Sequence, residues 1–131
     1  MVDLPVKRLI ERVVDSPLKL QLLLLFCEHR RLQGTDAQIA QRIYRDIGST
    51  HEALCELAED GILAVLPMAG EPTYVYRPRP ELLDPIVRLC QVYNEPIERD
   101  SLQRLVRDVA VFAPYRRTNT SFESDRLMMV V

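Results

Sequence analysis

Apolar residues repeat at helical spacing along most of this chain, and only one short region is patterned for β-strands. The strand-like runs 62–66 and 73–77 are separated by a loop that contains two prolines and a glycine, which is typical of a β-hairpin. With 131 residues the chain can form one core. The pattern predicts a mainly α protein with a small β-hairpin. Its expected helices are residues 3–14, 17–31, 36–46, 49–60, 81–94 and 98–113.

Two of these helices begin with the sequence of a capping box, in which a hydroxyl side chain accepts the N3 amide and a longer side chain reaches back. Thr35 with Gln38 has this spacing before helix 36–46, and Ser49 with Glu52 has it in helix 49–60. Gly61 is the expected stop of the second helix. The tight turn between the two helices is expected at residues 47–48.

Charge is distributed unevenly along the chain. The net charge is −2, and the chain has 17 basic residues. Residues 46–76 nevertheless contain six acids and no lysine or arginine. The acidity therefore belongs to one local region, which comprises the helix 49–60 and the hairpin.

Two segments resemble a known DNA-binding motif. The sequence Asp-Ala-Gln-Ile-Ala-Gln-Arg-Ile at 36–43 resembles the first helix of a helix-turn-helix motif. The sequence Ser-Thr-His-Glu-Ala-Leu-Cys-Glu-Leu-Ala-Glu-Asp-Gly-Ile-Leu at 49–63 resembles a recognition helix that leads into a wing. The chain thus resembles the winged helix-turn-helix family over residues 16–78. It is also similar to short bacterial helix-turn-helix regulators in which an aromatic wing strand leads into a proline, as in Tyr74-Val-Tyr-Arg-Pro, and a following helix ends in tyrosine, as at Tyr93.

The resemblance implies a winged helix-turn-helix domain at 1–113, with the motif at 36–60, the wing at 62–77 and additional N- and C-terminal helices. It implies a transcriptional regulator that binds double-stranded DNA. It further implies a homodimer, formed through the flanking helices 3–14, 81–94 and 98–113. Residues 114–131 are polar and aperiodic at first and apolar at the end, and they are expected to be a flexible C-terminal arm.

The expected recognition helix departs from the usual composition of DNA readers. Its outward positions lack the arginine, lysine, glutamine and asparagine that commonly contact bases. They are Ser49, His51, Glu52, Cys55, Glu56 and Glu59. The DNA-binding hypothesis therefore places phosphate contacts on arginines beside the acidic helix and base contacts on the two remaining donors. The candidate DNA-binding residues are Arg42, Arg45, Arg77 and Arg79 for phosphate, with Ser49 and His51 for bases.

An alternative hypothesis is a protein-interaction module that binds a basic partner through Glu52, Glu56 and Glu59. A structural explanation also exists for each acid. Glu52 fits the N3 position of a capping box, and Glu56 and Glu59 fit a solvated helix surface.

No sequence pattern indicates an enzyme. The chain has no glycine-rich phosphate loop, no nucleophile elbow and no His-Glu-x-x-His, so no catalytic residue and no cofactor is predicted. His51 and Cys55 are four residues apart and share one helix face, but idle thiols are favoured over a metal site because no further ligand is near in sequence. With neither a signal peptide nor a long apolar run, the chain is expected to be cytoplasmic and not to contact a membrane.

Overall fold

The computed structural model describes the backbone of residues 2–68 and 70–130 and the side chains of residues 2–67 and 70–114. This part of the chain contains six helices and a small three-stranded antiparallel sheet, as the sequence pattern predicted in outline. The helices are α1 (Leu4–Arg12), α2 (Pro17–Glu28), α3 (Asp36–Ile43), α4 (Ile47–Glu59), α5 (Pro80–Tyr93) and α6 (Pro96–Val130). The strands are β1 (Gln33–Gly34), β2 (Leu63–Met68) and β3 (Glu71–Tyr76).

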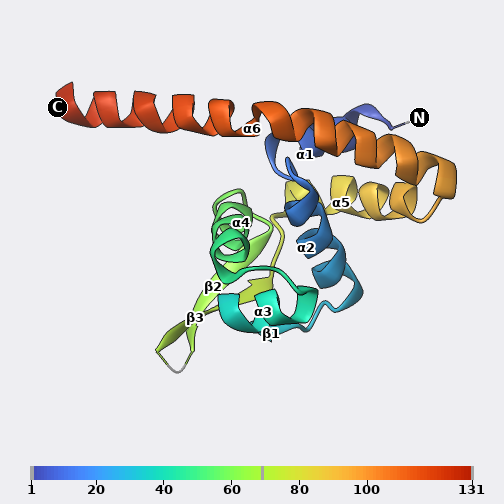
Figure 1. Cartoon of the computed structure of the whole chain (residues 1–131), viewed down its shortest axis with the longest axis horizontal. Helices are drawn as coiled ribbons and strands as arrows, with labels where there is room; N and C mark the ends of the chain where they lie inside the picture. The colour runs from blue at the N-terminus through green and yellow to red at the C-terminus, as the bar shows by residue number, and fades with distance from the viewer. Residues whose placement is uncertain (1, 69, 131) are drawn as a thin grey trace.

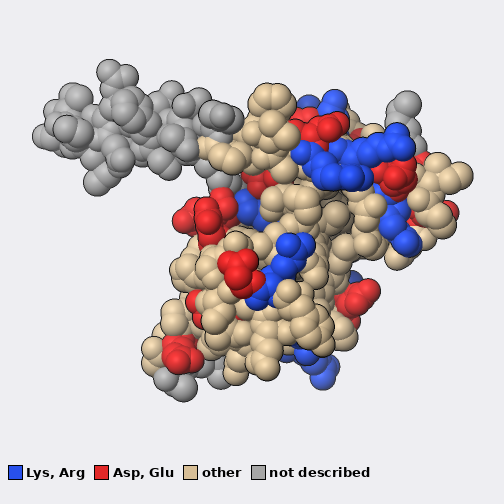
Figure 2. Space-filling view, viewed as in Figure 1, with Lys and Arg blue, Asp and Glu red and all other residues tan. Residues whose placement is uncertain are grey.

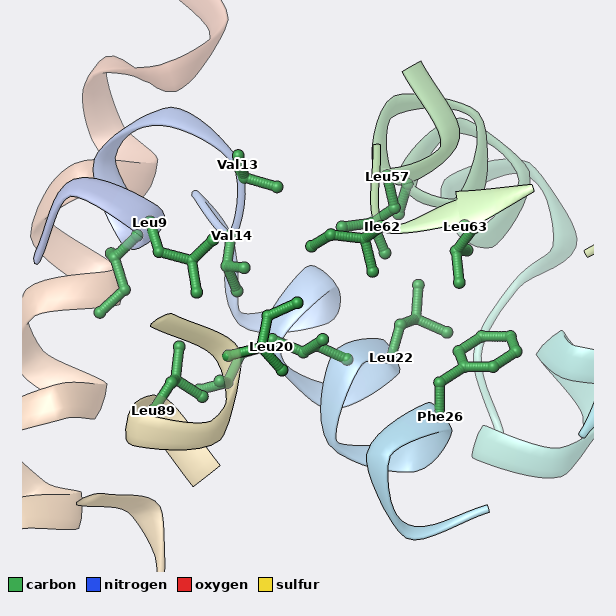
Figure 3. Close-up of a cluster of buried hydrophobic side chains, with 14 of the residues drawn as sticks. Leu9, Val13, Val14, Leu20, Leu22, Phe26, Leu57, Ile62, Leu63 and Leu89 are labelled. Atoms are coloured by element: carbon green, nitrogen blue, oxygen red, sulfur yellow. The ribbon is translucent and has the colours of Figure 1, made fainter. Parts of the chain in front are cut away.

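Helices α1, α5 and α6 lie together at one end of the molecule, and the hairpin β2–β3 projects from the other end (Figure 1). Helix α2 runs between these two parts. Its Leu20 side chain lies near Leu89 of α5, whereas Leu22 and Phe26 lie toward Ile62 and the start of β2 (Figure 3). Because α2 is apolar on both sides, it joins the two halves into one core, as expected for a helix that is hydrophobic all round.

The sheet has the order β1-β3-β2, and β1 is a strand that the sequence pattern did not predict. This strand is only two residues long, with Gln33 opposite Val75 and Gly34 opposite Tyr74. A run of two residues has no measurable periodicity, so β1 had no sequence signal. Its pairing ties the segment between α2 and α3 to the hairpin.

The hairpin loop is shorter than the sequence suggested. Residues 67–72 were expected as loop, but both prolines lie inside the strands, where Pro67 pairs with Pro72. The strands tolerate them because a directly opposed proline pair has no N–H to exchange and occupies a non-hydrogen-bonded position of the ladder. The last pair before the turn is Met68 with Glu71, and Gly70 between them has a φ of +79°.

Helix α6 does not end where it was expected to end. The sequence predicted a helix over 98–113 with a boundary at Pro114, whereas α6 begins at Pro96 and includes Pro114. Its buried contribution to the core is made early, by Leu102 and Val106. Side chains from residue 115 onward lie outside the described part of the structure, and the flexibility expected for 114–131 stays a prediction.

Candidate functional site

Helix α4 presents one apolar side to the core and an exposed N-terminal end to solvent. Ala53, Leu54 and Leu57 are buried, as their spacing predicted. Residues 44–49, which lead from the end of α3 into α4, are all exposed. Tyr44 is 93% exposed and has a φ of +57°, so the turn into α4 places an aromatic ring outside the core.

The cap of α4 differs from the predicted capping box. Asp46 is the N-cap, and its Oδ2 accepts a hydrogen bond of 2.7 Å from the backbone N–H of Ser49. Helix α4 therefore begins at Ile47, and the turn expected at residues 47–48 is instead its first turn. The hydrogen bond from Ser49 lowers the pKa of Asp46 below its ordinary value of 3.8, since it favours the charged carboxylate. The capping explanation for the acid at Glu52 thereby fails, and Glu52 is exposed.

Glu56 does not belong to the solvated surface of α4. The ammonium of Lys19, on α2, lies 3.2 Å from Glu56 and 2.6 Å from Asp15. Lys19 is 3% exposed and Asp15 is 1% exposed, so these two charges are buried, and the partly exposed Glu56 links them to α4. The expected outward position of Glu56 was wrong, and of the three glutamates in the protein-interaction hypothesis Glu52 and Glu59 remain exposed.

The four candidate arginines separate into two pairs at opposite ends of α4. Arg42 and Arg45 come just before α4, and Arg45 Nε donates to Gln21 Oε1 of α2 at 3.3 Å. The other pair is tied to the end of α4, because the Arg77 N–H donates to the Ile62 carbonyl and the Arg79 N–H donates to Gly61. A helix of 13 residues is about 20 Å long, so the two pairs do not form one patch.

Arg79 also covers the C-terminal end of α4. Gly61 has a φ of +93°, and a Cβ placed there would lie 2.6 Å from Cδ and Nε of Arg79. The Ile62 N–H donates to the Leu57 carbonyl and the Gly61 N–H to the Ala58 carbonyl, which is the hydrogen-bond pattern of a Schellman motif. Gly61 is therefore the expected stop, and Arg79 is held against it.

The surface charge agrees with this separation. In Figure 2 the basic side chains gather mainly over α6 and its neighbours, while the visible side of α4 and the hairpin carry acidic groups. A small basic group lies near the centre of that view, between the two regions. The acidic stretch found in the sequence is thus a surface around α4 and the hairpin, from which Glu56 is withdrawn by Lys19.

His51 takes part in a chain of side-chain contacts that the sequence did not reveal. Its Nδ1 lies 3.0 Å from Asp36 Oδ2 at the start of α3, and its Nε2 lies 3.5 Å from Cys55 Sγ. Cys55 Sγ in turn lies 3.4 Å from the hydroxyl of Tyr74 on β3. The spacing of His51 and Cys55 was a visible signal, but Asp36 and Tyr74 reach them only through the fold.

A second thiol cluster lies between α2, β3 and α5. Cys27 Sγ donates toward the Tyr76 hydroxyl at 3.9 Å. A hydrogen bond from Cys90 lowers the pKa of Cys27 to about 7, since it stabilises the thiolate, while the same contact raises the pKa of Cys90. Burial raises the pKa of Tyr76, which therefore remains a neutral hydroxyl.

A groove of about 770 Å³ lies between α2, the end of α3 and α6. Arg42 and Arg107 contribute basic groups to its lining, and Leu24 and Tyr93 contribute apolar surface. Arg42, one of the two candidate arginines before α4, therefore also lines this groove.

Among the residues that the structure describes, no group of three or more His, Cys, Asp or Glu side chains is placed to hold a metal ion. His51 and Cys55 contact each other but belong to no such group. No described helix is both long and apolar enough to cross a membrane.

The chain was compared with protein-family models, with curated proteins and with solved structures, and none of the three comparisons found a match.

Proposed function

We propose that this chain is a winged-helix transcriptional regulator that binds double-stranded DNA in an atypical way, through residues at the N-terminal end of α4. The element order α2, β1, α3, α4, β2, β3 supports the fold part of the proposal. Strand β1, which lies between α2 and α3 in the chain, adds to the hairpin by pairing with β3. In such a domain α4 is the recognition helix, and its N-terminal residues approach base edges.

The observation that carries the functional proposal is the exposed turn before α4. Residues 44–49 are exposed together, with Arg42 and Arg45 on either side of Tyr44. Two arginines close in sequence to an exposed ring suit the phosphates and sugars of one DNA strand. Ser49 is then the donor nearest to base edges, while His51 is partly engaged by Asp36. Arg77 and Arg79, at the far end of α4, contact phosphates only if the DNA runs along the whole helix.

A salt titration tests this proposal. Binding of fluorescent genomic duplex fragments is measured by anisotropy over a range of salt concentrations. Arg42→Ala plus Arg45→Ala should weaken binding and reduce the slope of log K against log salt by about 1 for each lost phosphate contact. Arg104→Ala, which removes an exposed arginine paired with Asp100 on α6, is the matched control and should change neither quantity. Salt-insensitive binding, or equal effects of both variants, would refute the DNA proposal.

A second candidate function is the binding of a basic protein by the acidic surface of α4. The exposed positions of Glu52 and Glu59, in a stretch without any lysine or arginine, favour this alternative. The double variant Glu52→Gln plus Glu59→Gln distinguishes the two functions by sign. It should strengthen DNA binding, because it removes repulsion from phosphates, and it should weaken binding to a basic protein.

The dimer belongs to the same proposal. Leu83 and Val87 are one turn apart on α5 and are 48% and 46% exposed, and Leu4 of α1 is exposed as well. This apolar surface lies on the helical end of the molecule, away from the hairpin (Figure 1). We propose that two copies pair there, which leaves both α4 helices accessible.

A further inference from the structure

We propose that Cys55 is a nucleophilic thiol that forms a covalent adduct with small activated alkenes, such as α,β-unsaturated carbonyl compounds, with His51 as its base and Asp36 as the group that orients the base. The three side chains stand in the order carboxylate, imidazole, thiol, with 3.0 Å between Asp36 Oδ2 and His51 Nδ1 and 3.5 Å between His51 Nε2 and Cys55 Sγ. This is the contact order of an activated nucleophile. The inference concerns the chemistry of the thiol and does not depend on DNA binding.

Asp36 fixes which nitrogen of His51 carries the proton. A carboxylate accepts a hydrogen bond, so the Nδ1 that faces Asp36 carries hydrogen and Nε2 presents its lone pair to Cys55. Asp36 is itself held in place, because its Oδ1 accepts a hydrogen bond of 2.7 Å from the Ala37 N–H. When His51 takes up a proton, the adjacent carboxylate stabilises the imidazolium that forms.

Tyr74 provides a hydrogen-bond donor to the sulfur. Its hydroxyl is 3.4 Å from Cys55 Sγ, and the tyrosine is buried at 3% exposure on β3. Burial raises the pKa of Tyr74, so its hydroxyl stays protonated and can donate to a thiolate. The sulfur therefore lies between two groups that support negative charge when it forms.

Two carboxylates on the exposed surface of α4 flank Cys55. Glu52 and Glu59 lie three residues before and four residues after Cys55, which places both carboxylates near it on the helix. These carboxylates repel a further negative charge, and the proposal has the thiol proton pass to His51 as the sulfur attacks. Lys19 does not offset this, because it is buried and paired with Asp15 and Glu56.

The reaction balances without an oxidant or a further reagent. His51 Nε2 accepts the thiol proton, and the sulfur lone pair forms a C–S bond to the β-carbon of the alkene. The electron pair of the C=C bond moves onto the α-carbon and its carbonyl group. The imidazolium then returns the proton to the α-carbon, which leaves a thioether at Cys55 and a neutral His51.

Access is consistent with this role. The side chain of His51 is 53% exposed and Cys55 is half-buried, so a small molecule can reach the sulfur from the solvent side of α4. An adduct would add bulk to the outward surface of α4, next to β3. Covalent modification would thereby alter whichever surface contact α4 makes.

The test measures how fast each cysteine reacts with N-ethylmaleimide, an activated alkene, in the full chain. Quenched samples are digested, and peptide mass spectrometry follows Cys27, Cys55 and Cys90 separately. At neutral pH the rate at Cys55 should fall about tenfold or more in His51→Ala, the lower range of general-base effects. Asp36→Asn should give a smaller decrease. The difference in rate between the wild type and His51→Ala should close at high pH, where hydroxide replaces the base.

Two controls separate base catalysis from other effects. The rate at Cys27, which contacts a different set of residues, should be unchanged in His51→Ala, and a parallel decrease there would overturn the proposal because it indicates general loosening. Glu59→Gln removes a charge from the same side of α4 and should have a smaller effect than His51→Ala. An unchanged rate at Cys55 in His51→Ala would also overturn the proposal.

Discussion

At the scale of single residues, the contact between Cys27 and Cys90 has a measurable consequence for pH dependence. Thiolate absorbance should show Cys27 titrating near pH 7, because the Cys90 thiol donates a hydrogen bond to it. Cys90→Ala removes the donor and should move the Cys27 pKa upward toward its ordinary value of 9.0, whereas Cys90→Ser retains a donor and should move it less. The same Cys27 pKa in Cys90→Ala and Cys90→Ser would contradict a hydrogen bond from Cys90 as the cause of the shift.

The same shift predicts how stability depends on pH. The pKa of Cys27 is about 7 in the folded protein, and its ordinary value is 9.0. Between these two pH values the unfolded chain binds more protons than the folded protein, so the contribution of Cys27 to stability grows with pH. Below pH 7 the contribution is lost. The raised pKa of Cys90 acts in the opposite direction and removes stability above pH 9.0. Denaturant unfolding at several pH values should show the rise between pH 7 and 9 in the wild type and a smaller rise in Cys90→Ala.

Lys19 provides a second prediction at this scale. Lys19→Met should destabilise the protein by about 3–5 kcal/mol, because it removes the buried ammonium that contacts Asp15 and Glu56. Glu56→Gln is the matched control and should cost less, since Lys19 keeps its 2.6 Å contact with Asp15. Urea denaturation gives both values. A cost for Lys19→Met no greater than that for Glu56→Gln would contradict a central role of the lysine.

The site residues show what the sequence can and cannot predict at this scale. The burial of Ala53, Leu54 and Leu57 follows from helical periodicity, and the prediction was confirmed. The withdrawal of Glu56 from the surface could not be predicted, because its partner Lys19 lies on another helix. Asp36 likewise meets His51 only through the packing of α3 on α4.

At the scale of elements, the start of α4 depends on one aspartate. Asp46→Ala should lower the melting temperature by a few degrees, because it removes the acceptor for the Ser49 N–H. Ser49→Ala should have a smaller effect, since it keeps the backbone N–H that Asp46 accepts. The difference in melting temperature between the wild type and Asp46→Asn should shrink as the pH falls through the lowered pKa of Asp46, because the Asp46 carboxylate of the wild type then becomes neutral. Thermal melts followed by circular dichroism test whether Asp46 is the N-cap. A larger loss of melting temperature in Ser49→Ala than in Asp46→Ala would contradict this assignment.

The elements also show which local signals can be trusted. Thr35 and Gln38 form the predicted capping box, with hydrogen bonds of 3.3 Å and 3.0 Å. The same sequence pattern at Ser49 and Glu52 is not used, because Asp46 caps the helix three residues earlier. Two competing caps differ by little in local energy, so tertiary packing decides between them.

At the scale of the whole molecule, the proposed dimer is the feature most open to measurement. Light scattering should give the mass of two chains for the wild type and one chain for Leu83→Glu plus Val87→Glu, because charge at the paired surface opposes its burial. Ile97→Glu is the control, since Ile97 is exposed at the junction of α5 and α6. A wild-type mass equal to that of one chain would refute the proposed dimer.

The overall class was predictable from the sequence, because helical periodicity and the single pair of strand-like runs do not depend on long-range contacts. The joining of the two halves by α2 was less visible. Helix α2 has leucines on more than one side, so its periodicity does not indicate which neighbouring element each leucine contacts.

The opposed prolines of the hairpin have a consequence for how copies of this chain avoid aggregation. Neither Pro67 nor Pro72 can donate a backbone hydrogen bond, and in a non-hydrogen-bonded pair the two nitrogens point outward, to opposite edges of the ribbon. Beyond the short reach of β1, each edge of the projecting hairpin therefore lacks a donor at one position. An incoming strand would meet a gap on either side, which discourages growth of the sheet from one molecule into the next.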